Sequence, residues 1–248
     1  MRPHTTPGAN VDAIPDGFCL TIPAGNDRRY RVAQLDDYTN LARGHFPAHP
    51  PLTLGLLARA SASSLPGTWG FGLWNDPFGL SLGFGGNPWR LPALPNAAWF
   101  FHASGENHLS FGEKPGNGFL AQVFRSPAIP SALLALAGIP ALPLLATRKS
   151  RGILRKLTGR VVREDGVRLG ADVTAWHGYR LEWSPMRCAF WVDDALVLES
   201  PVSPRPPLGL VIWIDNQYAA FTPEGKIGFG VLANAEPAWL EVKNIDVR

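Results

Sequence analysis

Short stretches in which apolar and polar residues alternate restrict this chain to an all-β fold more than any other feature of the sequence. In residues 173–183, alternation places Tyr179, Leu181 and Trp183 on one face of a strand. Residues 51–62 alternate in the same way. Gly (26 residues) and Pro (24 residues) are frequent between such stretches, a pattern typical of many short strands joined by turns.

The alternation continues along the chain and predicts a sandwich of two sheets. Further strands are expected at residues 18–22, 28–38, 67–79, 97–104, 116–126, 188–192 and 207–216, and in the closing segments GKIGFGVL and AWLEVKNIDV. Strands at this spacing, with long crossing connections, are typical of one sandwich domain, here over residues 1–248. Residues 1–17 show little periodicity and are expected to form a loose N-terminal arm.

The composition and the N-terminus favour a reducing, cytoplasmic location. Charged residues make up 17% of the chain, below the usual soluble average of about 25%, which suggests a large core or an apolar surface. The N-terminal residues contain no apolar run of signal-peptide length. Cys188 lies in an expected strand as a small buried thiol, so no disulfide with Cys19 is expected.

The charges are distributed unevenly along the chain. No acidic residue lies between Glu113 and Glu164, a span that holds nine basic residues: Lys114, Arg125, Arg148, Lys149, Arg151, Arg155, Lys156, Arg160 and Arg163. Because few aromatic residues accompany them, nucleic acid is not an expected partner. The sequence instead predicts contact with an anionic membrane surface through Arg148, Lys149, Arg151, Arg155 and Lys156, with a peripheral location at the membrane.

Residues 126–160 form an apolar and basic insert between the expected strands. Residues 126–147 are uncharged, but Pro130, Gly138, Pro140 and Pro143 interrupt them, so a membrane-spanning helix is not expected. The second half is amphipathic at helical spacing. Its apolar side carries Ala146, Ile153, Leu154 and Leu157, and its basic side carries Arg148, Arg151 and Arg155. The insert is predicted to be either a lid over the sandwich or a membrane-contact segment.

Three segments in this order resemble a known family: WHGYRLEW…P…CAFWVDD, SPRPPLGLVIWID and AWLEVKNIDV. The pattern is similar to that of the concanavalin A-like lectin/glucanase superfamily, and most similar to the laminarinase-type glycoside hydrolases of family 16. LPGTWGFGLWND resembles that family's Gly-Trp-Pro-Ala-Phe-Trp strand. The resemblance covers roughly residues 50–125 and 165–248, and it implies a concanavalin A-like jelly-roll β-sandwich.

The resemblance does not extend to the family's catalytic strand. That strand carries Glu-x-Asp-x-x-Glu or Glu-x-Asp-x-Glu, in which alternation brings a nucleophile and an acid/base side by side. The corresponding stretch here, NAAWFFHASGENH, has Ala, Trp, Phe and His at those spacings, and no other expected strand has acids at i, i+2 and i+4. The sequence therefore argues against retaining glycoside hydrolysis, whereas sugar binding by aromatic residues needs no carboxylate.

Candidate site residues come from three short segments, WNDPF, FFHASGENH and WIDNQY. The candidate catalytic residues are Asp76, Glu106, Asp215 and His102, and the candidate ligand-binding residues are Trp74, Asn75, Trp99, His108, Trp213, Asn216 and Tyr218. Alternatives remain open: WNDPF can be a turn, His102 can be a core histidine, and the polar run after Ile214 can be a surface turn. Trp213 and Asp215 are expected to share one face, with Asn216 on the other.

These residues support three hypotheses about function. The first is acid–base chemistry on an apolar small molecule, of lipid or isoprenoid type, in a cleft beneath the insert; an enzyme of this kind would be a lyase, isomerase, cyclase or hydrolase. The second is a non-catalytic glycan-binding module or a divergent glycoside hydrolase-like protein. The third is a membrane-surface scaffold. No metal and no cofactor are expected, because His102, Glu106 and His108 match no strong zinc signature.

Overall fold

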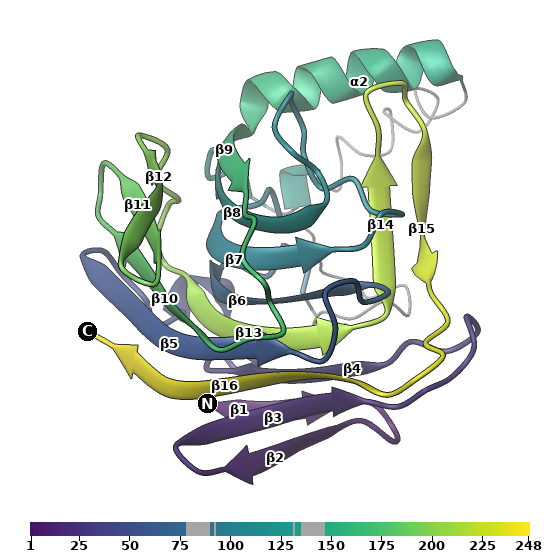
Figure 1. The fold of residues 1–248 in the computed structure, drawn as a ribbon. Helices are drawn as coiled ribbons and strands as arrows, with labels where there is room; N and C mark the ends of the chain where they lie inside the picture. The colour runs from purple at the N-terminus through teal and green to yellow at the C-terminus, as the bar shows by residue number, and fades with distance from the viewer. Residues whose placement is uncertain (78–89, 92, 131, 135–146) are drawn as a thin grey trace.

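A computed structural model describes residues 1–77, 90–91, 93–130, 132–134 and 147–248 (Figure 1). Two large antiparallel sheets face each other, and a hairpin and a helix lie at one end of the molecule. The first sheet contains, in spatial order, β1 (Arg2–Thr5), β4 (Val32–Asp36), β13 (Gly209–Asp215), β6 (Thr68–Trp74), β7 (Ala97–Ala103), β8 (Gly118–Arg125) and β9 (Arg163–Arg168). The second contains β12 (Ala195–Ser200), β11 (Cys188–Val192), β10 (His177–Trp183), β5 (Leu52–Ala60), β16 (Ala238–Val247), β3 (Gly17–Ile22) and β2 (Asn10–Ile14).

Four further elements lie outside the two large sheets. β14 (Gln217–Phe221) and β15 (Ile227–Val231) form a separate hairpin, η1 (Arg43–His45) follows β4, and α2 (Arg148–Val161) precedes β9. The helix begins at Thr147, whose side-chain oxygen accepts a hydrogen bond from the Ser150 backbone N–H at 3.2 Å. The predicted amphipathic helix is therefore present, while most of the apolar half of the insert lies outside the described residues.

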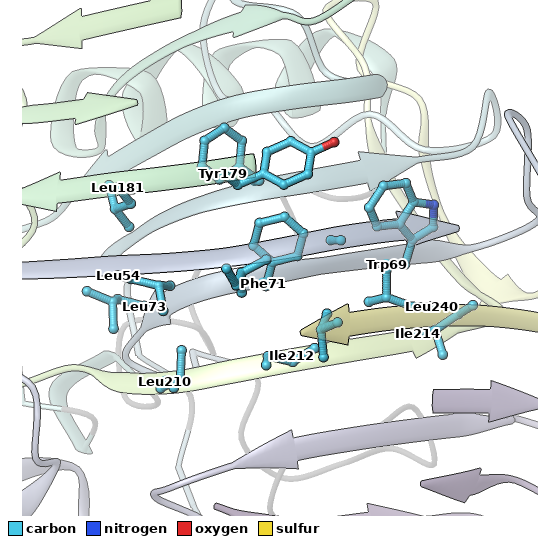
Figure 2. Close-up of a cluster of buried hydrophobic side chains, with 14 of the residues drawn as sticks. Leu54, Trp69, Phe71, Leu73, Tyr179, Leu181, Leu210, Ile212, Ile214 and Leu240 are labelled. Atoms are coloured by element: carbon cyan, nitrogen blue, oxygen red, sulfur yellow. The ribbon is translucent and has the colours of Figure 1, made fainter. Parts of the chain in front are cut away.

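The main hydrophobic core fills the space between the two sheets (Figure 2). Phe71 from β6 meets Tyr179 from β10 edge to face, with ring centroids 5.1 Å apart. Leu181 and Leu240 of the second sheet are also buried in this core. Aromatic pairs of this geometry add about 0.5–1.5 kcal/mol to the stabilisation from burial. The expected sandwich of two sheets is confirmed, and alternation along β10 places Tyr179, Leu181 and Trp183 inward as predicted.

The N-terminal arm is ordered, in contrast to the prediction of a loose segment. β1 pairs with β4, and β2 pairs with β3, at the edges of the two sheets. All four residues of β1 are exposed, so its sequence carries no apolar alternation. Backbone hydrogen bonds to the neighbouring strand hold this segment, and such bonds leave no periodic signal in the side chains.

Candidate functional site

The outer face of the first sheet carries a second apolar cluster made largely of aromatic rings. Trp74 and Trp213 stack with centroids 6.1 Å apart and an interplanar angle of 5°. Trp99 lies 5.6 Å from Trp213 and 5.3 Å from Phe101, and Phe101 itself stacks on Trp213 at 5.8 Å. Cross-strand register explains this grouping, because Trp213 and Phe101 both lie opposite Gly70, and Trp99 lies opposite Gly72.

The two glycines of β6 make room for these rings. A Cβ atom added at Gly70 would lie 2.9 Å from Cη2 of Trp213, and one added at Gly72 would lie 2.6 Å from Cβ of Trp99. The added atoms would lie even closer to the backbone of β7, at 2.4 Å from the Phe100 carbonyl oxygen and 2.5 Å from that of Ala98. Glycine at these two positions thus allows β7 and the Trp213 ring to lie close to β6.

Each of these indoles is satisfied within the protein. The N–H of Trp74 donates to the Tyr38 hydroxyl at 2.6 Å, and that of Trp213 donates to the Thr68 hydroxyl at 3.0 Å. Trp74, Trp99 and Trp213 are all less than a tenth exposed. The predicted ligand-binding tryptophans are therefore neighbours, as expected, but other side chains of the chain cover them.

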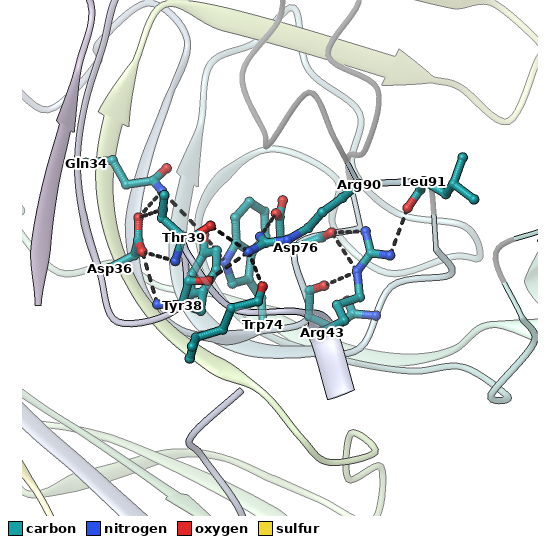
Figure 3. A network of polar contacts seen from close by, with 11 residues as sticks. Gln34, Asp36, Tyr38, Thr39, Arg43, Trp74, Asp76, Arg90 and Leu91 are labelled. Atoms are coloured by element: carbon teal, nitrogen blue, oxygen red, sulfur yellow. Dashed lines mark hydrogen bonds and ion pairs between the residues drawn. The ribbon is translucent and has the colours of Figure 1, made fainter. Parts of the chain in front are cut away.

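Asp76 lies just beyond the end of β6 and pairs with Arg90 (Figure 3). Both side chains are at least nine-tenths buried. Burial raises the pKa of Asp76, and the pairing with Arg90 lowers it by less. Asp76 adopts a left-handed backbone with φ of 45°, and the side chain of the preceding Asn75 bonds the Leu94 carbonyl and the Asn96 N–H. These bonds tie Asn75 to the segment before β7, and because Phe78 lies outside the described residues, the alternative of a turn at WNDPF stays a prediction.

Asp36 is a further carboxylate of this region, and it serves the turn after β4. Its oxygens accept hydrogen bonds from the Tyr38 N–H (3.1 Å), from the Thr39 N–H and hydroxyl (2.7 and 2.6 Å) and from the Gln34 amide (2.8 Å) (Figure 3). This set of donors saturates the carboxylate. Asp36 thus holds the turn that brings Tyr38 against Trp74.

Asp215 lies at the other end of β6, beside Thr68. One of its oxygens accepts from the Thr68 hydroxyl at 2.7 Å, and the other accepts from the Tyr30 hydroxyl at 3.2 Å. Burial raises the pKa of Asp215 to about 6 despite these hydrogen bonds. Since the Thr68 hydroxyl also accepts from Trp213, Asp215 and Trp213 share one face as predicted.

The separation of the two acids decides against a glycosidase pair. Asp76 and Asp215 flank opposite ends of β6, and its six steps from Thr68 to Trp74 span about 20 Å. Glycoside hydrolases place their two carboxyl groups about 5–10 Å apart. The acid–base roles predicted for Asp76 and Asp215 remain predictions, but the two residues cannot act together on one bond.

The aspartate at position 215 gives a direct prediction about stability. In Asp215→Asn, the amide oxygen can keep the bonds to Thr68, and the NH₂ can donate to the Tyr30 hydroxyl. The raised pKa means that ionised Asp215 costs stability above pH 6, so we expect the variant to be more stable than wild type by about 2 kcal/mol at pH 7. The gain should shrink toward pH 4, where the folded wild type holds the proton and the unfolded chain, with an ordinary pKa of 3.8, holds it in part.

Urea unfolding at pH 7 and at pH 4 measures this difference. Asp193→Asn is the matched control, because the exposed Asp193 carboxylate has a pKa that the His177 side chain lowers. That variant should gain no stability at either pH. Destabilisation of Asp215→Asn at pH 7 would show that the negative charge itself holds Tyr30 and Thr68 in place.

His102 does not face the aromatic cluster, which corrects its predicted place in a cleft. Alternation along β7 puts Trp99 and Phe101 on the outer face and His102 on the inner face, where it stacks on Trp69 at 5.4 Å and 7°. Burial lowers the pKa of His102 to about 4, and its Nδ1 atom has no hydrogen-bond partner. His102 is therefore a core histidine, which was the alternative to a position in a cleft.

The remaining candidates from the sequence are dispersed. Glu106 is exposed in the turn after β7, and the His108 ring lies 3.3 Å from the Arg155 guanidinium. Asn216 is fully buried and bonds the backbone of Arg29, Arg31 and Leu232. Tyr218 packs beside the glycines of β15. Within the described residues, no group of His, Cys, Asp and Glu could hold a metal ion.

A second aromatic group, which the sequence reasoning missed, lies on the outer face of the second sheet. We call it the tryptophan face: Trp176, Trp191 and Trp239 with Arg59, Arg180 and Lys243. The Arg59 guanidinium lies 4.9 Å from the Trp176 ring and 5.4 Å from the Trp239 ring. Of the tryptophans in the described ranges, these three are half-buried and the others are buried. The alternation of Trp239, Glu241 and Lys243 in β16 was the sequence pattern that could have indicated this face.

Two glycines and a leucine lie between the two aromatic groups of the tryptophan face. Trp191 pairs with Arg180 across β11 and β10, and Arg180 lies opposite Gly55 of β5. A Cβ atom added at Gly55 would meet nothing within 4 Å. Gly178 lies opposite the half-buried Leu57, whose Cδ2 atom would lie 3.8 Å from a Cβ added there. The face therefore presents indole rings and charged groups around a small apolar centre.

Two sheets of seven antiparallel strands packed over one core form a jelly-roll β-sandwich. No protein-family model matches the sequence, and no curated protein matches it. No described helix is long and apolar enough to cross a membrane.

Several solved structures are similar to the chain in fold. One is Rv0315, an immunostimulatory antigen and pseudo β-1,3-glucanase of Mycobacterium tuberculosis (15% identity, TM-score 0.47, covering 93% of this chain and 74% of that one). Another is a glycoside hydrolase family 16 endo-glucanase from Bacteroides ovatus (9%, 0.47, 97% and 85%). A third is the β-glucanase of Bacillus licheniformis (9%, 0.46, 97% and 89%). At these identities the likeness concerns the fold and not the activity.

Proposed function

We propose that the chain is a non-hydrolytic β-sandwich that binds a neutral glycan on its tryptophan face. The observation that carries this proposal is the position of the accessible indoles. In the described part of the chain, the half-buried tryptophans all lie on this one face, next to charged side chains that can bond hydroxyl groups. The tryptophans of the first sheet are covered and make their hydrogen bonds within the protein.

The chemistry of the face suits a sugar ring. The C–H face of a pyranose is weakly positive and packs on the negative face of an indole. Arginine, lysine and glutamate side chains form charge-assisted hydrogen bonds with the hydroxyls around the ring. Arg59 is paired with Glu241 at 2.7 Å, so its charge is neutralised beside Trp176 and Trp239, while Lys243 adds one cation over the Trp176 ring. Because the indoles would hold the uncharged C–H face of a sugar ring, we expect the ligand to be a neutral glycan.

The carboxylates of the first sheet support binding without hydrolysis. β7 carries no acidic residue, and Asp36 is saturated by the turn that follows β4. Asp76 and Asp215 lie at opposite ends of β6, too far apart to attack and protonate one glycosidic bond.

Affinity electrophoresis against a panel of neutral soluble polysaccharides tests this function. We expect one or more glycans to retard the protein, and Trp176→Ala and Trp239→Ala each to weaken binding roughly tenfold, the effect of losing one ring contact. Phe229→Ala, which removes an exposed aromatic ring on β15, is the matched control and should bind like wild type.

Two results would contradict the proposal. If wild type binds no polysaccharide, or if the Trp variants and Phe229→Ala bind equally well, the tryptophan face is not a glycan site. If wild type releases new reducing ends from a bound glycan, the protein is a hydrolase whose acids lie elsewhere than on β7.

Acid–base chemistry on an apolar substrate, of lipid or isoprenoid type, is the second candidate function. It has the support of Asp215, whose buried carboxyl has a pKa of about 6 beside the aromatic cluster of the first sheet. Turnover of a lipid panel by wild type and its loss in Asp215→Asn, which should stay folded, would favour this function over glycan binding.

A further inference from the structure

One side of α2 exposes a stripe of apolar residues to solvent. Ile153, Leu157 and Val161 are 55%, 48% and 42% exposed, respectively. Residues four positions apart lie on the same side of a helix, so the three form a continuous stripe about 12 Å long. The apolar side of the predicted amphipathic helix therefore faces away from the sandwich.

A buried arginine holds the helix in this orientation. Arg155 lies two positions from both Ile153 and Leu157, which puts it about 160–200° away from them around the helix. Its guanidinium donates to the carbonyls of Ser110 (2.7 Å), Gly112 (2.8 Å) and Phe221. Rolling the helix to bury the stripe would break these bonds. The prediction that Arg155 lies on a free basic side is therefore wrong, since the guanidinium is needed to satisfy buried carbonyls.

Positive charge borders the stripe. Lys156 and Arg160 are exposed, and Arg163 is exposed just beyond the helix. The helix contains no acidic residue. A groove of about 630 Å³ is lined by Ile153, Lys156 and Arg160 of the helix, and by Glu113 and Glu224 from other segments. The stripe, Lys156 and Arg160 all lie on α2, whereas the acids beside them do not.

We propose that this side of α2 docks the protein on an anionic phospholipid surface. A helix with an apolar stripe and flanking cations lies in the plane of a membrane interface, with the stripe among the acyl chains and the cations at the headgroups. The proposal is independent of glycan binding. Figure 1 shows α2 at the end of the molecule opposite β2 and β3.

Flotation with vesicles of equal phosphatidylglycerol and phosphatidylcholine tests this surface. Wild type should float with these vesicles and remain free with phosphatidylcholine alone. The double variant Lys156→Glu/Arg160→Glu should bind about 30-fold more weakly, from the loss of two cations at the headgroups. Leu157→Asp should weaken binding by a similar factor, because the stripe loses its central residue.

The matched control is Arg28→Glu/Arg29→Glu, which makes the same change of charge on the exposed segment between β3 and β4. It should bind like wild type, and thermal melts of all variants show whether they are folded. Equal loss of binding in the control and in Lys156→Glu/Arg160→Glu would overturn the proposal, since net charge alone would explain it. The proposal would also be overturned if wild type does not bind vesicles but forms a dimer, and if Leu157→Asp dissociates that dimer. The stripe would then be an interface between copies of the chain.

Discussion

Replacing Arg90 by methionine is expected to lower the free energy of unfolding by about 3–5 kcal/mol, the usual cost of leaving a buried charge without its partner. Arg90 pairs with Asp76, and its other nitrogen donates to the carbonyls of Tyr38 (2.7 Å), Thr39 (3.0 Å) and Leu41 (2.7 Å) (Figure 3). Methionine fills a similar volume but satisfies none of these groups. For a chain of this size the melting temperature should fall by roughly 6–20 °C.

Two further variants separate the ion pair from the rest of the network. In Arg90→Met/Asp76→Asn the buried charge is gone, so part of the lost stability should return. Arg187→Met is the matched control, because it breaks an ion pair with Glu199 in which both side chains are about half exposed. It should cost less than about 1 kcal/mol. If Arg90→Met costs no more than this control, the network does not hold the segment after β4 against the first sheet.

The network explains why the predicted site residues group as they do. Trp74 and Asp76 belong to one short segment, and Tyr38 and Arg90 approach it from two other segments. The sequence pattern indicated that WNDPF ends a strand, but it could not indicate which distant arginine would pair with Asp76. Asp76 and Arg90 both lie outside the strands, so their pairing depends on how two loops pack against the sheet, which leaves no local signal in the sequence.

Alternation along single strands was the most reliable guide to the fold. It predicted that Tyr179, Leu181 and Trp183 share one face of β10 and that Trp213 and Asp215 share one face. The same rule places His102 on the inner face of β7, opposite to Trp99 and Phe101. The expectation of a cleft histidine followed the family resemblance instead, and it was wrong for that reason.

Which face meets solvent could not be read from the sequence. The alternating Trp239, Glu241 and Lys243 of β16 are as regular as the strands of the first sheet, yet only packing shows that these residues lie outside. The helix α2 gives a second case, since Arg155 has the sequence environment of a surface cation but is buried and bonds three backbone carbonyls. Burial of a polar group depends on distant partners.

His102 is expected to make the folded state sensitive to acid. Its pKa is lowered from 6.5 to about 4 by burial, so the unfolded chain binds a proton below pH 6.5 that the folded chain binds only near pH 4. Acidification through this window therefore favours unfolding, and the contribution lost by pH 4 is about 3 kcal/mol. Above pH 6.5, His102 is neutral in both the folded and the unfolded chain, so this contribution to the free energy of unfolding is fully present.

The variant His102→Phe removes this proton uptake and keeps an aromatic ring on Trp69. The Nδ1 atom of His102 has no hydrogen-bond partner in wild type, so replacing the imidazole by a phenyl ring should not lower the free energy of unfolding at pH 7. Between pH 7 and pH 4 the variant should lose about 3 kcal/mol less than wild type in urea unfolding. The exposed His49 is the control, and His49→Phe should keep the pH dependence of wild type. Equal acid sensitivity in His102→Phe and wild type would mean that His102 is hydrated or charged in the folded protein, contrary to its place between the sheets.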